Sequence, residues 1–217
     1  MMKKLLPFLL PVFIFMLNSC LGISADIQMR RDGSARVTLE YKFSRMAETV
    51  GRLDGNEQWH IIPVGRADWE RTTARIDDMR LVSFSSREDA KDFVNRVTLE
   101  FTNAQALLKF LDSSGRRASL NRDNNLNRLN IILNEPVTSE INGDLMDLMK
   151  QISAGYRFNI TFSAQGNSTM TITDGAGKTT ALPAGAQAAT SGRTVSFAID
   201  TAEILNKPEG LGLSFSW

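Results

Sequence analysis

Apolar and polar residues alternate along many short segments of this chain. The clearest segment lies near the C-terminus, where polar residues separate Tyr156, Phe158, Ile160 and Phe162. Because successive side chains of a strand point to opposite faces of its sheet, this pattern predicts a strand with one buried and one solvated face. The same alternation predicts further strands within Ile23–Met29, Val37–Phe43, Leu81–Ser85, Val97–Phe101, Ala118–Leu120, Leu129–Leu133, Met170–Ile172, Val195–Ile199 and Leu211–Trp217.

Turn-forming residues join several of these strands. Asp32-Gly33-Ser34 lies between the first two strands and predicts a hairpin, and residues 121–125 predict another. Residues 174–192 are rich in Gly, Ala and Thr and include a proline. That composition predicts a long loop between two strands.

Helical spacing interrupts the strands in a few places. Asn103 is a good N-cap for an apolar stripe over residues 104–111, and Asn142 precedes a similar stripe that ends at Ile152. Residues 44–50 and 67–76 are weaker helical candidates. This order of elements predicts an α+β fold with a mainly antiparallel sheet of short strands and two to four helices.

The first twenty residues have the order of a secretory signal. Lys3 and Lys4 precede an uncharged run from Leu5 to Leu17, and the small residue Ser19 follows shortly after it. The apolar run is too short for a membrane-spanning helix, and it contains two prolines. We therefore expect a removable signal peptide over residues 1–19 and one exported domain over residues 20–217.

The end of this segment resembles a bacterial lipoprotein signal. Leu17, Asn18 and Ser19 stand where that signal has its lipobox, directly before Cys20, the one cysteine of the chain. The resemblance implies that the Cys20 thiol receives a diacylglycerol, that cleavage occurs just before it, and that a fatty acid such as palmitate acylates the new amine. Asn18 departs from the usual small or apolar residue. An ordinary secretory signal with an incidental cysteine is the alternative.

Composition narrows the range of functions for the exported part. Once Cys20 carries a lipid, no thiol remains for a disulfide or a thiolate metal site. The 25 basic residues lose Lys3 and Lys4, which leaves 23 against 24 acidic ones. The net charge of a near-neutral chain gives no reason to expect nucleic acid or a strongly anionic membrane as a partner.

The stretch ISADIQMRRDGSARVTLEYKF after the cysteine, together with YRFNITFSAQG and SGRTVSFAID near the end, resembles the LppM family of mycobacterial and actinobacterial lipoproteins. Two features depart from that family: Ser163-Ala164-Gln165-Gly166 replaces the usual Pro-Gly after the late strand, and no C-terminal membrane segment follows. The resemblance implies an envelope lipoprotein whose folded domain contacts lipids or glycolipids. It brings no catalytic residues.

Signals for catalysis, nucleotides or metals are weak. His60 is the single histidine and lies between apolar neighbours, so it is best interpreted as a packed or surface side chain. Residues 175–180 imitate the end of a phosphate-binding loop, but Ile172 stands where the first glycine is required. Asn121, Asp123 and Asn125 have the spacing of calcium ligands, but Leu126 and Ile132 replace the required glycine and glutamate.

Two charged regions have a functional and an ordinary interpretation. The adjacent acids Asp77-Asp78 and Glu88-Asp89 can act as acid and base only if they share a cleft. Arginines with nearby tryptophans suit a membrane interface, but acids in the same stretch can pair with those arginines on a solvated face. This stretch contains Trp59, Arg66, Asp68, Trp69, Glu70, Arg71, Arg75, Arg80 and Arg87.

From these features we expect a membrane-anchored lipoprotein of the bacterial cell envelope that acts as a non-catalytic binding module, without a cofactor, for a lipid or glycolipid. A structural or assembly role through protein partners is the alternative. The first hypothesis predicts an apolar cavity or groove beneath the sheet, and the second predicts a filled core and a protein partner that binds through sheet edges and loops. An enzyme would require perturbed carboxylates in a cleft with His60.

Overall fold

A computed structural model of the chain describes residues 21–44, 65–88, 91–112, 114–123, 126–136, 143, 147, 151 and 153–217. The signal peptide predicted over residues 1–19, its lipobox Leu17-Asn18-Ser19, and Cys20 lie outside the described residues. His60 and Trp59, most of the helix predicted to end at Ile152, and all but the first residue of the candidate helix over 44–50 lie outside them as well.

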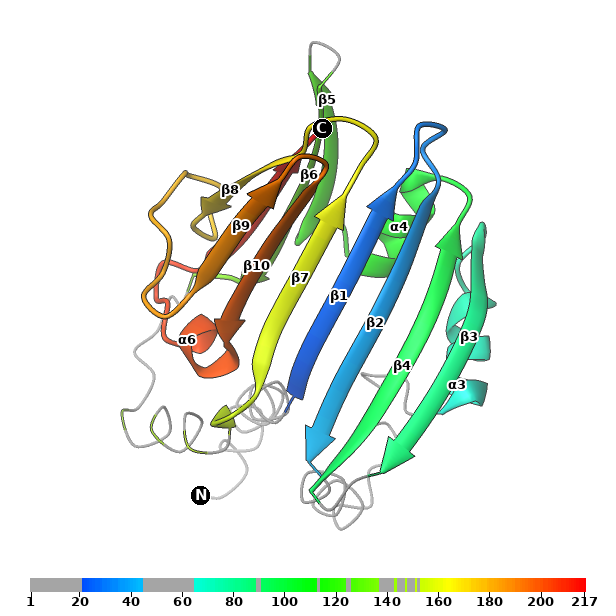
Figure 1. Cartoon of the computed structure of the whole chain (residues 1–217), viewed down its shortest axis with the longest axis horizontal. Helices are drawn as coiled ribbons and strands as arrows, with labels where there is room; N and C mark the ends of the chain where they lie inside the picture. The colour runs from blue at the N-terminus through cyan, green and yellow to red at the C-terminus, as the bar shows by residue number, and fades with distance from the viewer. Residues whose placement is uncertain are drawn as a thin grey trace, which may run out of the picture.

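A seven-stranded sheet, sheet A, forms the framework of the molecule, with strand order β3-β4-β2-β1-β7-β10-β9 (Figure 1). All of its neighbouring strands are antiparallel except β1 and β7, which are parallel. The strands of sheet A are β1 (Leu21–Met29), β2 (Ala35–Ser44), β3 (Met79–Glu88), β4 (Asp92–Phe101), β7 (Arg157–Ser163), β9 (Gln187–Ser191) and β10 (Thr194–Asp200).

The β1–β2 hairpin forms where the sequence predicts it. Asp32 Oδ1 accepts hydrogen bonds from the Ser34 backbone N–H at 3.0 Å and from Ser34 Oγ at 2.7 Å. Gly33 has a φ of 82°, a conformation that side chains rarely adopt. The turn sets a register that pairs Ile27 with Val37 and Ala25 with Leu39, so the apolar residues of both strands share one face.

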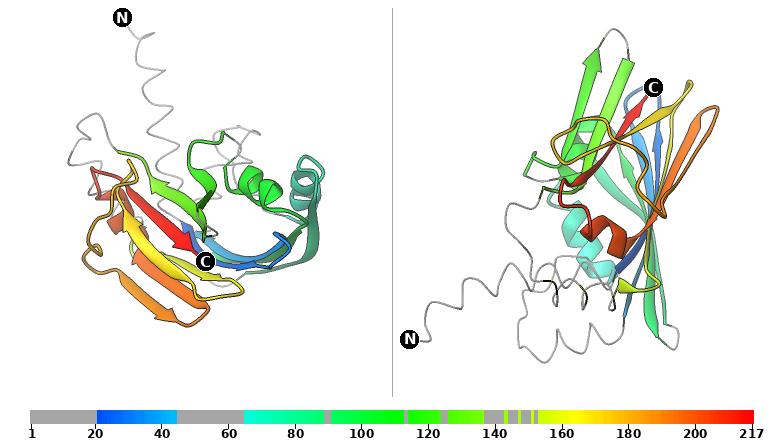
Figure 2. Two further views of the ribbon diagram at one scale, coloured as in Figure 1. Left: turned by 90° about the horizontal axis from the view of Figure 1, so that it is seen from above. Right: turned by 90° about the vertical axis from the view of Figure 1, so that its left-hand side faces the viewer.

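A smaller sheet, sheet B, lies on the concave side of sheet A (Figure 2). Its order is β5-β6-β11-β8, and all of its pairs are antiparallel. The two sheets pack through aromatic rings: Phe162 stacks on Phe215 at 4.8 Å between ring centroids and contacts Trp217 at 5.0 Å. The strands of sheet B are β5 (Ala118–Asp123), β6 (Leu126–Asn134), β8 (Thr169–Thr173) and β11 (Leu211–Ser216).

Two helices cover the same side of sheet A over β2, β4 and β3 (Figure 2). They are α3 (Arg66–Thr73) and α4 (Ala104–Leu111). Asn103 caps α4 as predicted, because its Oδ1 accepts a hydrogen bond from the Ala106 N–H at 2.9 Å. Trp69 of α3 and Phe110 of α4 meet at 6.2 Å, and Phe110 packs on Phe101 of β4 at 5.4 Å. A third helix, α6 (Thr201–Leu205), follows β10 directly.

The predicted fold class is confirmed: the described residues form an α+β structure with two mainly antiparallel sheets and three helices. The loop predicted over residues 174–192 is wrong over Gln187–Ser191, where β9 pairs with β10. All five residues of β9 are exposed, so the strand has no apolar alternation, and its pairing with β10 defines it. The short helix α6 has no counterpart among the predicted elements.

Candidate binding surface

The residues that the sequence offers as candidates for phosphate, metal or membrane binding form turns, hairpins and ion pairs in the structure. In the turn after β8, the Asp174 carboxylate accepts hydrogen bonds from the N–H groups of Ala176 and Lys178, both at 2.9 Å. The N–H groups of Gly175 and Gly177 donate to the backbone carbonyls of Glu209 and Asp174. These amides are the groups that a phosphate-binding loop would present to its ligand. The segment is therefore a closed turn.

The candidate calcium ligands belong to the β5–β6 hairpin, as the ordinary interpretation predicts. Asn121 pairs with Arg128 and Asp123 with Leu126, whereas Asn125 lies outside the described residues. Among the described residues, no group of three histidine, cysteine, aspartate or glutamate side chains lies close enough to hold a metal ion.

The stretch of arginines and tryptophans packs as part of the domain. Trp69 is 2% exposed, and its Nε1 donates a hydrogen bond to the Tyr41 hydroxyl at 3.0 Å. Arg71 forms an ion pair with Asp68, and Arg66 lies 3.9 Å from Glu70. Trp69 is therefore a core residue, and the acids of the stretch pair with its arginines. Asp78, one of the adjacent acids, accepts a hydrogen bond from Asn103 Nδ2 at 2.9 Å.

The outer, convex face of sheet A is polar. Its most connected group is Glu100 of β4, which forms ion pairs with Arg36 at 2.6 Å, with Arg30 at 3.5 Å and with Arg80. The hydrogen bonds from Arg36 and Arg80 lower the pKa of Glu100 to about 2. The carboxylate is thus satisfied by arginines and is a structural cross-link between β2, β4 and β3.

The inner face of sheet A is apolar, but its two ends differ in exposure. At the upper end in Figure 1, where β1 ends and β2 begins, Val37 and Leu99 are fully buried and Met29 is 5% exposed. From the middle of β1 toward the opposite end, where β1 begins, six apolar side chains of the same face are only half-buried. This set, which we call the lower inner patch, comprises Ile23, Ala25, Leu39, Phe43, Phe93 and Phe158.

The strand register arranges the lower inner patch in three cross-strand pairs, and the buried Tyr41 lies between Leu39 and Phe43 on β2. Phe158 of β7 is opposite Ile23, Ala25 is opposite Leu39, and Phe43 is opposite Phe93. The rings of Phe43 and Phe93 stack at 5.2 Å. The patch therefore combines aliphatic and aromatic surface, which is the kind of surface that accepts apolar ligands.

Two polar side chains lie next to this apolar surface. Tyr41, opposite Ile23, is 3% exposed, and its hydroxyl accepts the hydrogen bond from Trp69. Burial raises the pKa of Tyr41. Asn95, opposite Tyr41 on β4, is 1% exposed. A neutral phenol and a carboxamide bring polarity without charge to the patch.

The sequence places the patch residues on the inner face but does not show that they remain half-exposed. Their alternation is the same as that of the fully buried residues farther along the strands. The difference arises from which covering element lies opposite each end, and no local pattern encodes that.

Among the described residues, no helix is long and apolar enough to cross a membrane.

Comparison with known proteins gives one similar structure. The folded domain of Mycobacterium tuberculosis LppM, solved by NMR, is similar over 91% of this chain and 88% of that domain, with 12% sequence identity and a TM-score of 0.48. No family model matches the chain, and no curated protein matches it. The resemblance to the LppM family is supported only as a weak likeness, from which neither membership nor function follows.

Proposed function

We propose that this protein is a lipid-anchored module of the bacterial cell envelope that binds an apolar ligand of the lipid class without catalysis. The observation that carries the proposal is the partial exposure of the six apolar side chains of the lower inner patch on one face of sheet A. When an acyl chain covers partly exposed phenylalanine and aliphatic side chains, the free energy falls by about 25 cal/mol for each Å² of apolar surface removed from water.

The anchor part of the proposal rests on the lipobox-like sequence before Cys20. A doubly or triply acylated cysteine holds a protein at a membrane surface, whereas a single acyl chain binds only weakly. We expect the Cys20→Ser variant to remain unprocessed or to lose its anchor. Unchanged membrane attachment of a processed Cys20→Ser chain would contradict lipidation.

The ligand part is tested by native mass spectrometry of residues 21–217 exported to a bacterial periplasm and purified without detergent. We expect a lipid bound in stoichiometric amount. Ala25→Trp, which fills the centre of the patch, should abolish the bound lipid. Ala189→Trp, on the exposed strand β9, is the matched control and should retain it. A wild-type protein free of lipid would overturn ligand binding.

A second candidate function, assembly through sheet edges, is favoured by the contrast between the two edges of sheet A. β9 is exposed along its whole length and carries neither charge nor proline. The opposite edge, β3, has a register shift between Leu81 and Ser83 and carries Arg80, Arg87 and Glu88, features that prevent strand addition. β9 is therefore the edge to which a strand of a second copy can add.

Sedimentation of the unanchored chain at increasing concentration tests this second function. Strand addition at β9 predicts dimers that Ala189→Lys abolishes, because the new charge lies on the exposed edge strand. The matched control is Ser83→Lys on β3, which should leave dimers unchanged. A monomer at all concentrations would remove this candidate.

A further inference from the structure

The first strand of the domain begins directly after the proposed lipid-bearing residue. Leu21 is the first residue of β1 and pairs with Phe43 of β2. Adjacent Cα atoms lie about 3.8 Å apart, so a lipid on Cys20 is attached to sheet A without a linker. Whatever surrounds the start of β1 must then lie at the membrane surface.

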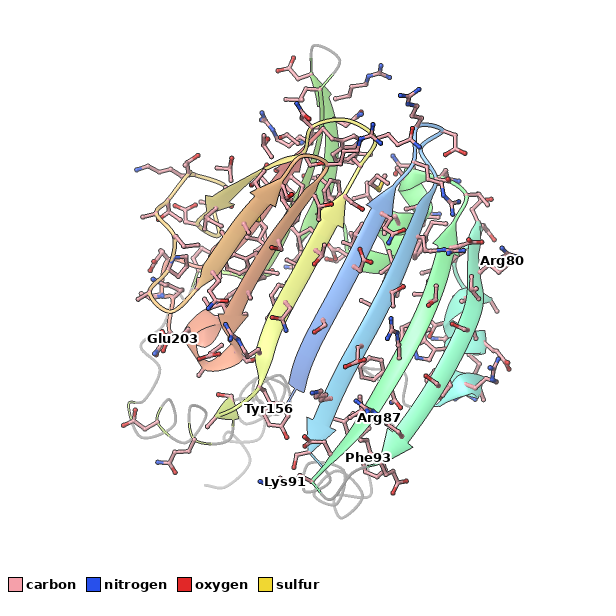
Figure 3. The ribbon with its side chains drawn as sticks, in the orientation of Figure 1. Arg80, Arg87, Lys91, Phe93, Tyr156 and Glu203 are labelled. Carbon is pink, nitrogen blue, oxygen red and sulfur yellow. The ribbon has the colours of Figure 1, made fainter. Side chains whose placement is uncertain are left out.

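The side chains around the start of β1 are amphipathic. Lys42 and Arg87 are exposed on the outer face, and Phe43 and Phe93 are half-buried on the inner face. Tyr156 lies beside Gly22, because a Cβ atom on that glycine would be 3.4 Å from the Tyr156 ring. Figure 3 shows Arg87, Phe93 and Tyr156 at this same end of the sheet. We call these five residues the anchor-end rim.

The charges at this end favour an anionic partner. Arg157 pairs with Asp200 at 3.2 Å, and Asp92 accepts a hydrogen bond from the Tyr156 hydroxyl at 2.7 Å. Lys91 and Glu88, also at this end, each have interactions of their own. Within the described part of the chain, neither Lys42 nor Arg87 has an ion-pair partner, so both charges are available to phosphate.

Val94 of β4 is the cross-strand neighbour of both Lys42 and Arg87. It lies on the polar outer face of β4 yet is only 3% exposed. Long basic side chains cover apolar surface with their methylene stems while the charged head remains in water. Lys42 on β2 and Arg87 on β3 therefore flank Val94 from either side of β4, on the outer face at this end of the sheet.

We propose that the anchor-end rim docks the domain onto the headgroup layer of a membrane that contains anionic phospholipid. Lys42 and Arg87 contact lipid phosphates, and the aromatic side chains of Phe43, Phe93 and Tyr156 lie at the boundary between headgroups and acyl chains. The docking rests on the proposed anchor at Cys20. It turns the exposed end of the lower inner patch toward the bilayer, from which a lipid ligand can enter.

The test uses the full chain, produced with its signal in a bacterium and reconstituted into vesicles of phosphatidylcholine with or without phosphatidylglycerol. An environment-sensitive fluorophore is attached at Ser86→Cys on β3, near the rim, or at Arg31→Cys in the turn at the opposite end of the sheet. A lipid on Cys20 leaves the added thiol as the one free site. Flotation of the same vesicles reports anchoring independently.

We expect a blue shift at position 86, but not at position 31, that requires phosphatidylglycerol and decreases with salt. Lys42→Glu with Arg87→Glu should abolish the shift while the protein still floats. Arg31→Glu with Arg122→Glu, at two exposed arginines away from the rim, is the matched charge control for the Ser86→Cys chain. It should leave the shift intact.

The two readouts separate the possible failures. A chain that floats but gives the same emission with and without phosphatidylglycerol overturns rim docking alone. A chain that does not float overturns the anchor, and with it the docking. An equal shift at positions 31 and 86 also overturns the docking, because it would mean that the domain has no preferred orientation at the membrane.

Discussion

The two ends of the inner face of sheet A are built from the same strands with the same alternation of apolar and polar residues. The apolar side chains of β1, β2 and β4 are buried at one end, which we call the sealed end, and several are partly exposed at the other. At the upper end, Ala35 and Val37 of β2 are fully buried, and Phe101 of β4 is 1% exposed beneath α4. At the lower end, Leu39 and Phe43 of the same β2 strand keep part of their surface exposed, although Tyr41 between them is 3% exposed. Alternation thus determines which face a residue occupies, and the covering layer determines how deeply it is buried.

The comparison also separates stability from function. Fully buried phenylalanine side chains contribute to folding the full free energy of transfer from water. Partly exposed ones contribute less and retain apolar surface that a ligand can cover. If the lower inner patch binds a ligand, substitutions of its residues should lower the free energy of unfolding only slightly but should weaken ligand binding. The following substitutions test both parts of that statement.

The largest expected effect comes from Phe162, at the centre of the sealed region. It is 0% exposed and packs against Phe215 and Trp217, so Phe162→Ala should lower the free energy of unfolding by about 3–5 kcal/mol. Phe158→Ala, on the same strand but in the lower inner patch, should cost about 1–2 kcal/mol. Urea unfolding of both variants measures the difference. Equal losses would show that the two ends do not differ.

The next effect concerns the hydrogen bond between Trp69 of α3 and Tyr41, which is buried next to the lower inner patch. Trp69→Phe and Tyr41→Phe should each cost about 1–2 kcal/mol, because each removes one partner of a buried hydrogen bond. The double variant should cost less than the sum of the two. A double-mutant cycle measures this coupling, and strictly additive losses would contradict the bond.

Much of this fold could be predicted from local sequence. The Asp32-Gly33-Ser34 turn, the Asn103 cap and the strands around Phe158 and Val195 have patterns that depend on neighbours within a few residues. β9 could not be predicted, because its five residues carry no apolar alternation and its pairing with β10 defines it. The parallel pairing of β1 with β7 joins segments more than a hundred residues apart, which a local pattern does not encode.

The candidate site was less predictable than the fold. The partial exposure of Phe43 and Phe93 depends on the position of the helices and of sheet B, which is set by tertiary packing. Trp69 was open to a membrane-interface interpretation from its arginine neighbours, but Tyr41 of a distant strand holds it in the core. The lipobox before Cys20 remains a prediction from sequence.

A smaller effect is expected at the N-cap of α4, the helix that covers the sealed end. Asn103→Ala removes the acceptor for the Ala106 N–H and should cost about 1 kcal/mol. Asn103→Ser, which can still cap, is the control and should cost less. Hydrogen exchange should show faster opening at α4 and β4 near Phe101 than at Phe158. Uniform acceleration across the sheet would contradict a local role for the cap.

The smallest effect lies on the outer face, behind the sealed end, where Glu100 holds three arginines. Its pKa in the folded protein is about 2, below the ordinary 4.5, so folding favours the ionised form. The stabilisation is fully present above pH 4.5 and is lost as the pH falls to about 2. Glu100→Gln should therefore reduce thermal stability slightly at pH 7, and the difference from wild type should shrink toward pH 2. Glu40→Gln on the same face is the control for loss of one carboxylate. A Glu100→Gln difference that is constant across this pH range would show that the arginines do not stabilise the ionised carboxylate, and would leave the sealed end supported by its inner face alone.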